Sequence, residues 1–261
     1  MNGRSLHDAL LRVLTDAPLR RAILGGNAPG DGGVGPAEAA TLRRSDGDRI
    51  ERMARFLARH FYRERIVRLF AGTRALATRT GRDPLSSLES PAFRATVADA
   101  RLGSPESADA VARLVEETLL RDDAPLLEAF PFWRDLVRYE GTFFRAEAAP
   151  RAWKGAPEPS PFPRRSPGLR IAEFEWDLPA ALPAVLRGAE PPPSAHARAR
   201  LFFAASPGGK VSVARCPDPL LRLFEVLDGT RTLEDLAPAL GVERSALEAT
   251  VTRLRELGAV V

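Results

Sequence analysis

The segment from Arg198 to Val261 constrains the fold more than any other, because its hydrophobic pattern changes from strand period to helix period within a short length. Residues 198–205 and 210–215 alternate as half-buried strands do, and Ser206-Pro-Gly-Gly209 between them predicts the turn of a hairpin. Three stretches with apolar residues at helical spacing follow, at 217–227, 232–240 and 245–257. Two helices joined by a short turn containing glycine, next to a hairpin, predict a winged-helix-like arrangement.

A proline-rich run separates this segment from the first half of the chain. The five prolines of residues 151–167 enforce an extended path with few hydrogen bonds, which predicts a linker over this range. A chain of 261 residues is long enough for about two domains. The expected fold is therefore α+β, with a mainly α-helical N-terminal domain over residues 1–150 and a small winged-helix-like domain over residues 168–261.

The N-terminal half shows helical spacing almost throughout. Its longest helix is expected over residues 45–71, and two more begin at Ser90-Pro91 and Ser104-Pro105, where a serine cap precedes a proline at the first helical position. Glycines predict a flexible loop over residues 25–40. Within it, residues 30–35 have the glycine spacing of the dinucleotide-binding fingerprint, but a helix precedes them where that fingerprint requires a strand. We interpret them as a surface loop.

An arginine row follows one face of the long helix, at Arg52, Arg55, Arg59 and Arg63. Such a row is either a solvated face that pairs partly with Glu51 and its neighbours, or a docking surface for an acidic partner. A second charged residue, Glu140, lies one helical turn from apolar residues on both sides. A carboxylate in that position either pairs with an arginine, such as Arg138 or one from another helix, or stays a buried acid.

The residues that could carry catalysis are dispersed along the chain. His7, His60 and His196 are far apart and lack the spacing of metal ligands, so we expect no metal and no catalytic residue in this chain. The one cysteine, Cys216, allows no internal disulfide and is expected to be a small buried residue. The N-terminus has no signal-peptide pattern and no run reaches membrane-spanning length, which predicts a cytoplasmic protein.

The order of these parts resembles one bacterial family. A helical half that ends in Phe132-Trp-Arg-Asp-Leu-Val-Arg-Tyr-Glu140, a proline-rich joint, an extended segment at 169–178, the hairpin and the helix-turn-helix end are arranged similarly in a group of partner subunits. These subunits accompany multinuclear non-haem iron oxidases in the biosynthesis of ribosomal peptides, of which the methanobactin and thiaglutamate pathways are the best known. The resemblance covers most of the chain and rests on order and pattern more than on invariant residues.

The resemblance implies a non-catalytic subunit of a heterodimer. Its C-terminal part would recognise a short precursor peptide, its helical part would help to hold the iron oxidase, and the iron ligands would belong to that enzyme. An exposed edge of the C-terminal sheet could bind the peptide as an additional strand. The candidate peptide-binding residues are then Arg200, Phe202, Val211 and Val213, although Phe202 and the valines could equally be core residues.

The alternative function is that of a helix-turn-helix DNA-binding regulator, with residues 245–257 as the recognition helix. The formal net charge of the chain is +4, but residues 168–261 hold 11 basic and 12 acidic residues, a net charge of −1. Phosphate contacts supply most non-specific affinity for DNA, so the domain with the DNA-binding topology lacks the charge that this function needs. We therefore do not expect nucleic acid as the partner.

Overall fold

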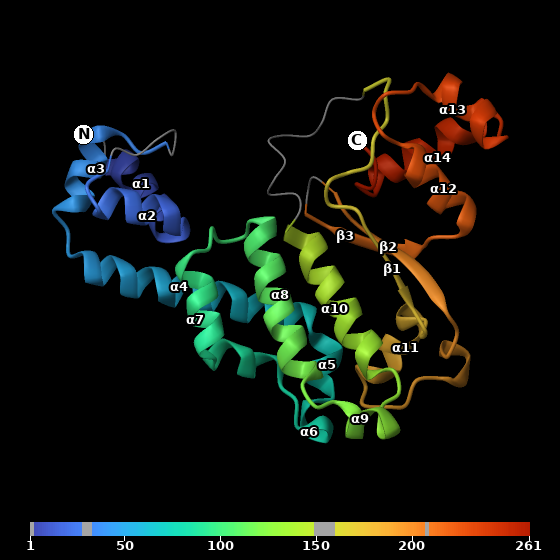
Figure 1. Cartoon of the computed structure of the whole chain (residues 1–261), viewed down its shortest axis with the longest axis horizontal. Coiled ribbons are helices and arrows are strands. Elements are labelled where there is room, and N and C mark those ends of the chain that lie inside the picture. Colours follow the sequence, from blue (N-terminus) through green and yellow to red (C-terminus); the bar gives the residue numbers. More distant parts are fainter. Residues whose placement is uncertain (1–2, 28–32, 149–159, 207–208) are drawn as a thin grey trace.

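The computed structural model describes residues 3–27, 33–148, 160–206 and 209–261, and it has the expected α+β architecture. Helices make up the N-terminal part, and one three-stranded antiparallel sheet follows in the described residues (Figure 1). The sheet lies between the helices of the N-terminal part and the three helices that end the chain.

An N-terminal lobe of three short helices packs on the first turns of a long one. Its helices are α1 (Gly3–Thr15), α2 (Ala17–Leu24), α3 (Pro36–Arg43) and the start of α4 (Gly47–Leu69). Its core includes Val13, Ile23, Leu42 and Ile50. The prediction of a flexible loop over residues 25–40 is wrong for residues 36–40, which belong to α3. Pro36 occupies the first position of this helix, where a backbone N–H would have no helical partner. Residues 28–32 lie outside the described part of the chain.

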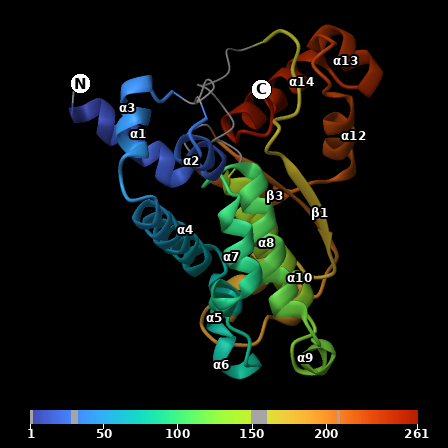
Figure 2. The same cartoon turned by 60° about the vertical axis from the view of Figure 1, so that its left-hand side comes forward.

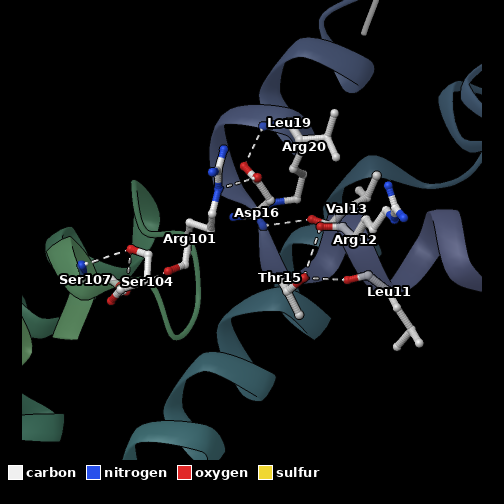
Figure 3. A network of polar contacts seen from close by, with 10 residues as sticks. All are labelled: Leu11, Arg12, Val13, Thr15, Asp16, Leu19, Arg20, Arg101, Ser104 and Ser107. Atoms are coloured by element: carbon white, nitrogen blue, oxygen red, sulfur yellow. Dashed lines mark hydrogen bonds and ion pairs between the residues drawn. The ribbon is translucent and has the colours of Figure 1, made fainter. Parts of the chain in front are cut away.

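The lobe is joined to the rest of the helical part through Asp16, between α1 and α2 (Figure 3). The Asp16 carboxylate caps α2 by accepting a hydrogen bond from the Leu19 N–H at 3.0 Å, and it accepts a second from Arg101 Nε at 2.7 Å. The Leu102 N–H also donates to the Thr15 carbonyl at 2.8 Å. A single side chain therefore caps the start of α2 and also bonds to a loop about 85 residues further along the chain.

The body of the helical part is built on α4, α8 and α10, and α8 and α10 run side by side (Figure 2). Serine caps start α7 and α8 as predicted, with Ser90 Oγ accepting from the Phe93 N–H and Ser104 Oγ from the Ser107 N–H. The elements here are α5 (Ala71–Ala75), α6 (Ala77–Thr80), a 3-10 helix (Pro84–Glu89), α7 (Pro91–Ala98), α8 (Pro105–Leu120), α9 (Ala124–Ala129) and α10 (Trp133–Ala148).

The sheet has the order β1-β2-β3, and both neighbouring pairs are antiparallel. Ala172 of β1 lies opposite Leu201 of β2, and Phe203 of β2 lies opposite Val213 of β3. The elements of this part are β1 (Arg170–Phe174), α11 (Leu178–Val185), a 3-10 helix (Pro193–Ala195), β2 (Ala199–Ala205), β3 (Val211–Arg215), α12 (Asp218–Val226), α13 (Leu233–Leu240) and α14 (Arg244–Glu256).

The central strand, β2, is buried on both faces. Leu201 and Phe203 belong to the core of the helical part, whereas Phe202 and Ala204 belong to a second core formed with α12–α14. The alternating sequence pattern predicted a strand with one face exposed to solvent. This prediction is wrong, because the last three helices cover that face. The sheet therefore contributes side chains to two hydrophobic cores. The core of the helical part includes residues from both sides of the predicted linker.

Local hydrogen bonds and a glycine set the bounds of α13. Thr232 and Asp235 form a reciprocal capping box at the start of α13, and Gly241 ends that helix with a φ of 67°. The final apolar residues make one β-bridge, between Val260 and Arg165. Residues 160–167 of the predicted linker thus lie against the end of the chain, and residues 151–159 lie outside the described part.

Candidate functional site

The two edges of the sheet differ in which backbone groups they leave free. The Cys216 N–H donates to the Arg200 carbonyl at 2.8 Å, and the Ser206 N–H donates to the Lys210 carbonyl at 2.9 Å. Bonded pairs alternate along an antiparallel ladder, so the even-numbered residues of β2 bond to β3. By the same alternation, the N–H and C=O groups of alternate residues point away from β2 at each edge. At β3 these are Val211, Val213 and Arg215, and at β1 they are Ile171 and Glu173.

The edge of β1 is partly occupied by side chains of α10. Asp135 accepts hydrogen bonds from the N–H groups of Glu175 and Trp176, at 2.6 and 3.0 Å, and Arg138 donates to the Glu173 carbonyl at 3.4 Å. These contacts take the place of a neighbouring strand just where β1 ends. An extended ligand that approached this edge would have to displace both side chains.

The edge of β3 has no such cover within the described part of the chain. No hydrogen bond from those residues reaches the outward N–H or C=O groups of Val211 and Val213. The side chains of both valines are half-buried against the core of the helical part, which holds the strand in place. β3 is therefore a short, rigid edge with an unpaired row of donors and acceptors.

The four predicted peptide-binding residues fall into two pairs. Val211 and Val213 lie on the open edge strand, whereas Arg200 and Phe202 lie on the central strand. Phe202 is only 2% exposed, and its ring packs edge-on against Phe224 with centroids 5.7 Å apart, so its side chain is a core residue. Arg200 and Phe202 do not lie on an open edge because β1 pairs with the second edge of β2. The sequence predicts the hairpin but not this pairing.

Arg200 is held by two carboxylates. Its guanidinium donates to Glu173 at 2.8 Å and to Asp218 at 2.6 Å. These hydrogen bonds lower the pKa values of both carboxyl groups below their ordinary range. The arginine therefore joins β1, β2 and the start of α12 into one charged cluster, and its role in the structure is to link these elements.

A polar hollow of about 480 Å³ lies beside this cluster. Its lining includes Arg138, Glu173, Glu175, His196 and Arg198. The His196 ring stacks on Trp176, with the ring centroids 4.4 Å apart. Arg198 and Arg200 both bond to Glu173 and keep it ionised. The neighbouring Cys216 is buried as expected, and burial raises the pKa of its thiol, which opposes formation of the reactive thiolate.

The predicted partner-docking row on α4 is exposed along its length. Arg52 lies 3.9 Å from Asp46, Arg59 forms an ion pair with Glu89, and Arg55 and Arg63 are exposed on the same helix. Between them stands Phe56, which is 69% exposed and which we did not single out from the sequence. Its position two turns before Arg63 on the polar side of the helix was the available signal. The row and Phe56 remain a candidate docking surface.

Glu140 is a buried acid, and no arginine forms an ion pair with it within the described part of the chain. It is 3% exposed and accepts hydrogen bonds from the N–H groups of Gly72 and Thr73, at 2.6 and 3.2 Å, at the start of α5. Arg138, the expected partner, lies instead near Asp135 and the Glu173 carbonyl. Burial raises the pKa of Glu140 to about 8, and the N–H donors offset part of that rise.

This buried acid predicts a specific pH dependence of stability. The pKa of Glu140 in the folded protein, about 8, lies above its ordinary value of 4.5, so its favourable contribution is complete below pH 4.5 and is lost as the pH rises through 8. Wild type should therefore lose up to about 1.4 kcal/mol of unfolding free energy per pH unit across this range relative to E140Q. Urea unfolding of both proteins at pH 5, 7 and 9 measures the difference. The exposed Glu117→Gln is the control, and parallel pH profiles of wild type and E140Q would contradict the assignment.

The described residues contain no group of three or more His, Cys, Asp or Glu side chains placed to hold a metal ion. Among the helices that the structure describes, none has the length and apolar character needed to cross a membrane. A comparison with models of known protein families finds no match to the chain, and a comparison with curated protein sequences finds none that is similar.

Proposed function

We propose that this chain is a non-catalytic partner subunit that binds a ribosomal precursor peptide and presents it to a multinuclear iron oxidase. The observation that carries the proposal is the open edge of β3. Its outward backbone groups, at Val211, Val213 and Arg215, match the donors and acceptors of an extended peptide, which can bind by adding a strand. The edge of β1 is disfavoured because Asp135 and Arg138 already bond to it.

The position of β3 suits a recognition role. The sheet is fixed between two hydrophobic cores, so a peptide would meet a preformed edge and the binding site would lose little conformational entropy. Main-chain hydrogen bonds would hold the peptide in an extended form, with its alternate side chains accessible. The iron would belong to the oxidase, and the arginine row of α4 with Phe56 is the surface proposed to hold that enzyme in a heterodimer.

The charges of the helix-turn-helix disfavour the alternative of a DNA-binding regulator. On α14, Arg244 forms ion pairs with Glu234 and Glu248, and Arg253 bonds to Glu256 at 2.6 Å. Glu248 and Glu256 belong to α14 itself, so α14 would carry these carboxylates toward the DNA together with its arginines. Binding would then bring negative charge to the phosphates as well as positive charge.

A titration distinguishes the two functions. If a short open reading frame adjoins the gene of this chain, the fluorescently labelled peptide that it encodes is expected to bind with 1:1 stoichiometry. Any DNA duplex is expected to bind no tighter than roughly 10 µM at physiological salt, within the non-specific range. Nanomolar, sequence-specific retention of a duplex in a gel shift, together with no binding of the peptide, would reverse the assignment.

A further inference from the structure

The side chains of β3 divide between the two faces of the sheet. Successive side chains of a strand point to opposite faces, so Val211, Val213 and Arg215 share one face and Ser212 and Ala214 share the other. The two valines pack against the core of the helical part, which identifies their face. Ala214 packs against the second core, on the opposite side.

A strand added outside β3 would place its side chains alternately on the same two faces of the sheet. Its residues directly opposite Val211, Val213 and Arg215 would project on the same face as those side chains, at the short distances at which cross-strand pairs interact. Apolar or β-branched residues are favourable opposite the two valines. Opposite Arg215, an acidic residue is favourable and a basic one is repelled.

The charge at Arg215 is available for such a pair. Its side chain is 65% exposed, and the guanidinium already forms an ion pair through Nη2 with the nearly buried Asp177. A guanidinium has five N–H donors in a planar fork, so one carboxylate does not exhaust it. Asp177 also holds the side chain in position, which reduces the entropy that a second ion pair would cost.

We propose that the peptide bound by this chain carries an acidic residue followed, at the second and fourth positions after it, by two apolar residues. In the antiparallel direction these three side chains lie opposite Arg215, Val213 and Val211 in turn. Both existing strand pairs are antiparallel, and antiparallel pairing is the more stable kind. This inference rests on the proposed function and assigns the chemical class of the peptide.

The test uses synthetic, fluorescently labelled nonapeptides on the wild-type chain. The reference peptide has glutamate, valine and valine at alternate positions with threonine between them. Replacing its glutamate by lysine should weaken binding about fivefold, and replacing it by glutamine should weaken binding less. Moving the glutamate by one position, so that it faces the other side of the strand, is the matched control and should weaken binding as the glutamine replacement does. A peptide with the reversed sequence tests the direction.

A protein variant completes the test. Arg215→Gln should bind the glutamate and lysine peptides with nearly equal affinity, and circular dichroism checks that the variant is folded. If wild type binds the glutamate and lysine peptides equally, the proposed preference is wrong, although strand addition stands. If the reversed peptide binds more tightly than the reference, the antiparallel assignment is wrong. If neither these peptides nor the precursor peptide bind, both this inference and the proposed function are wrong.

Discussion

Replacing Val213 by proline is expected to weaken binding of the precursor peptide at least about tenfold while the sheet stays folded. The Val213 N–H points away from β2 and has no partner among the described residues, so its removal costs no hydrogen bond inside the protein. Proline is tolerated on an edge strand when its nitrogen faces outward. A bound strand, however, would lose one main-chain hydrogen bond and would meet the proline ring.

The matched control is Ile171→Pro. Ile171 occupies the equivalent outward position on β1, the edge that α10 partly covers, so this substitution should leave peptide affinity unchanged. Affinity is measured by fluorescence anisotropy, with circular dichroism as the folding control. If both folded variants bind like wild type, strand addition at β3 is wrong. If only Ile171→Pro loses binding, the peptide adds to the other edge.

Replacing Gly258 by alanine, where the end of α14 meets β2, is expected to lower the free energy of unfolding by about 3 kcal/mol or more. Gly258 has a φ of 79°, which L-residues rarely adopt, and this alone costs about 1–2 kcal/mol. A Cβ added here would also lie 2.7 Å from the Ser206 Cα and closer still to the Ala205 carbonyl. These are backbone atoms at the end of β2, which cannot move aside as a flexible side chain could.

The variant Gly241→Ala measures the cost of the left-handed backbone conformation without an added steric clash. Gly241 ends α13 with a φ of 67°, yet a Cβ added to it would meet no atom within 4 Å. The variant should lose only the conformational cost, about 1–2 kcal/mol. Urea unfolding of both variants measures the difference. Equal losses would contradict direct packing of the α14 end against β2.

Elements that depend on neighbouring residues could be predicted from the sequence. Ser90 and Ser104 cap α7 and α8 because each Oγ accepts a backbone N–H bond from the first turn, and the proline that follows each serine marks the first helical position. Thr232 and Gly241 bound α13 by local hydrogen bonds. The hairpin of β2 and β3 follows from alternation and a short turn. Each of these features needs only a few successive residues, and the sequence contains them directly.

Features that depend on distant residues could not be predicted. Alternation places Phe202 on the face opposite Phe203, but only the packing of α12–α14 shows that this face is buried too. Likewise, Glu140 finds its partners at Gly72 and Thr73, more than 60 residues earlier, so the pattern around Glu140 could not reveal them. The choice of β3 as the open edge is of the same kind, since it depends on where β1 and α10 lie.

The most direct test of the account is the exchange of individual amide protons, followed by NMR with and without saturating precursor peptide. The account predicts that the N–H groups of Val211, Val213 and Arg215 become protected when the peptide binds, while those of Ser212 and Ala214, already bonded to β2, change little. The N–H of Ile171 on β1 should be unaffected. Unchanged exchange along β3 while the peptide is bound, or new protection confined to β1, would contradict the claim that β3 is the peptide-binding edge.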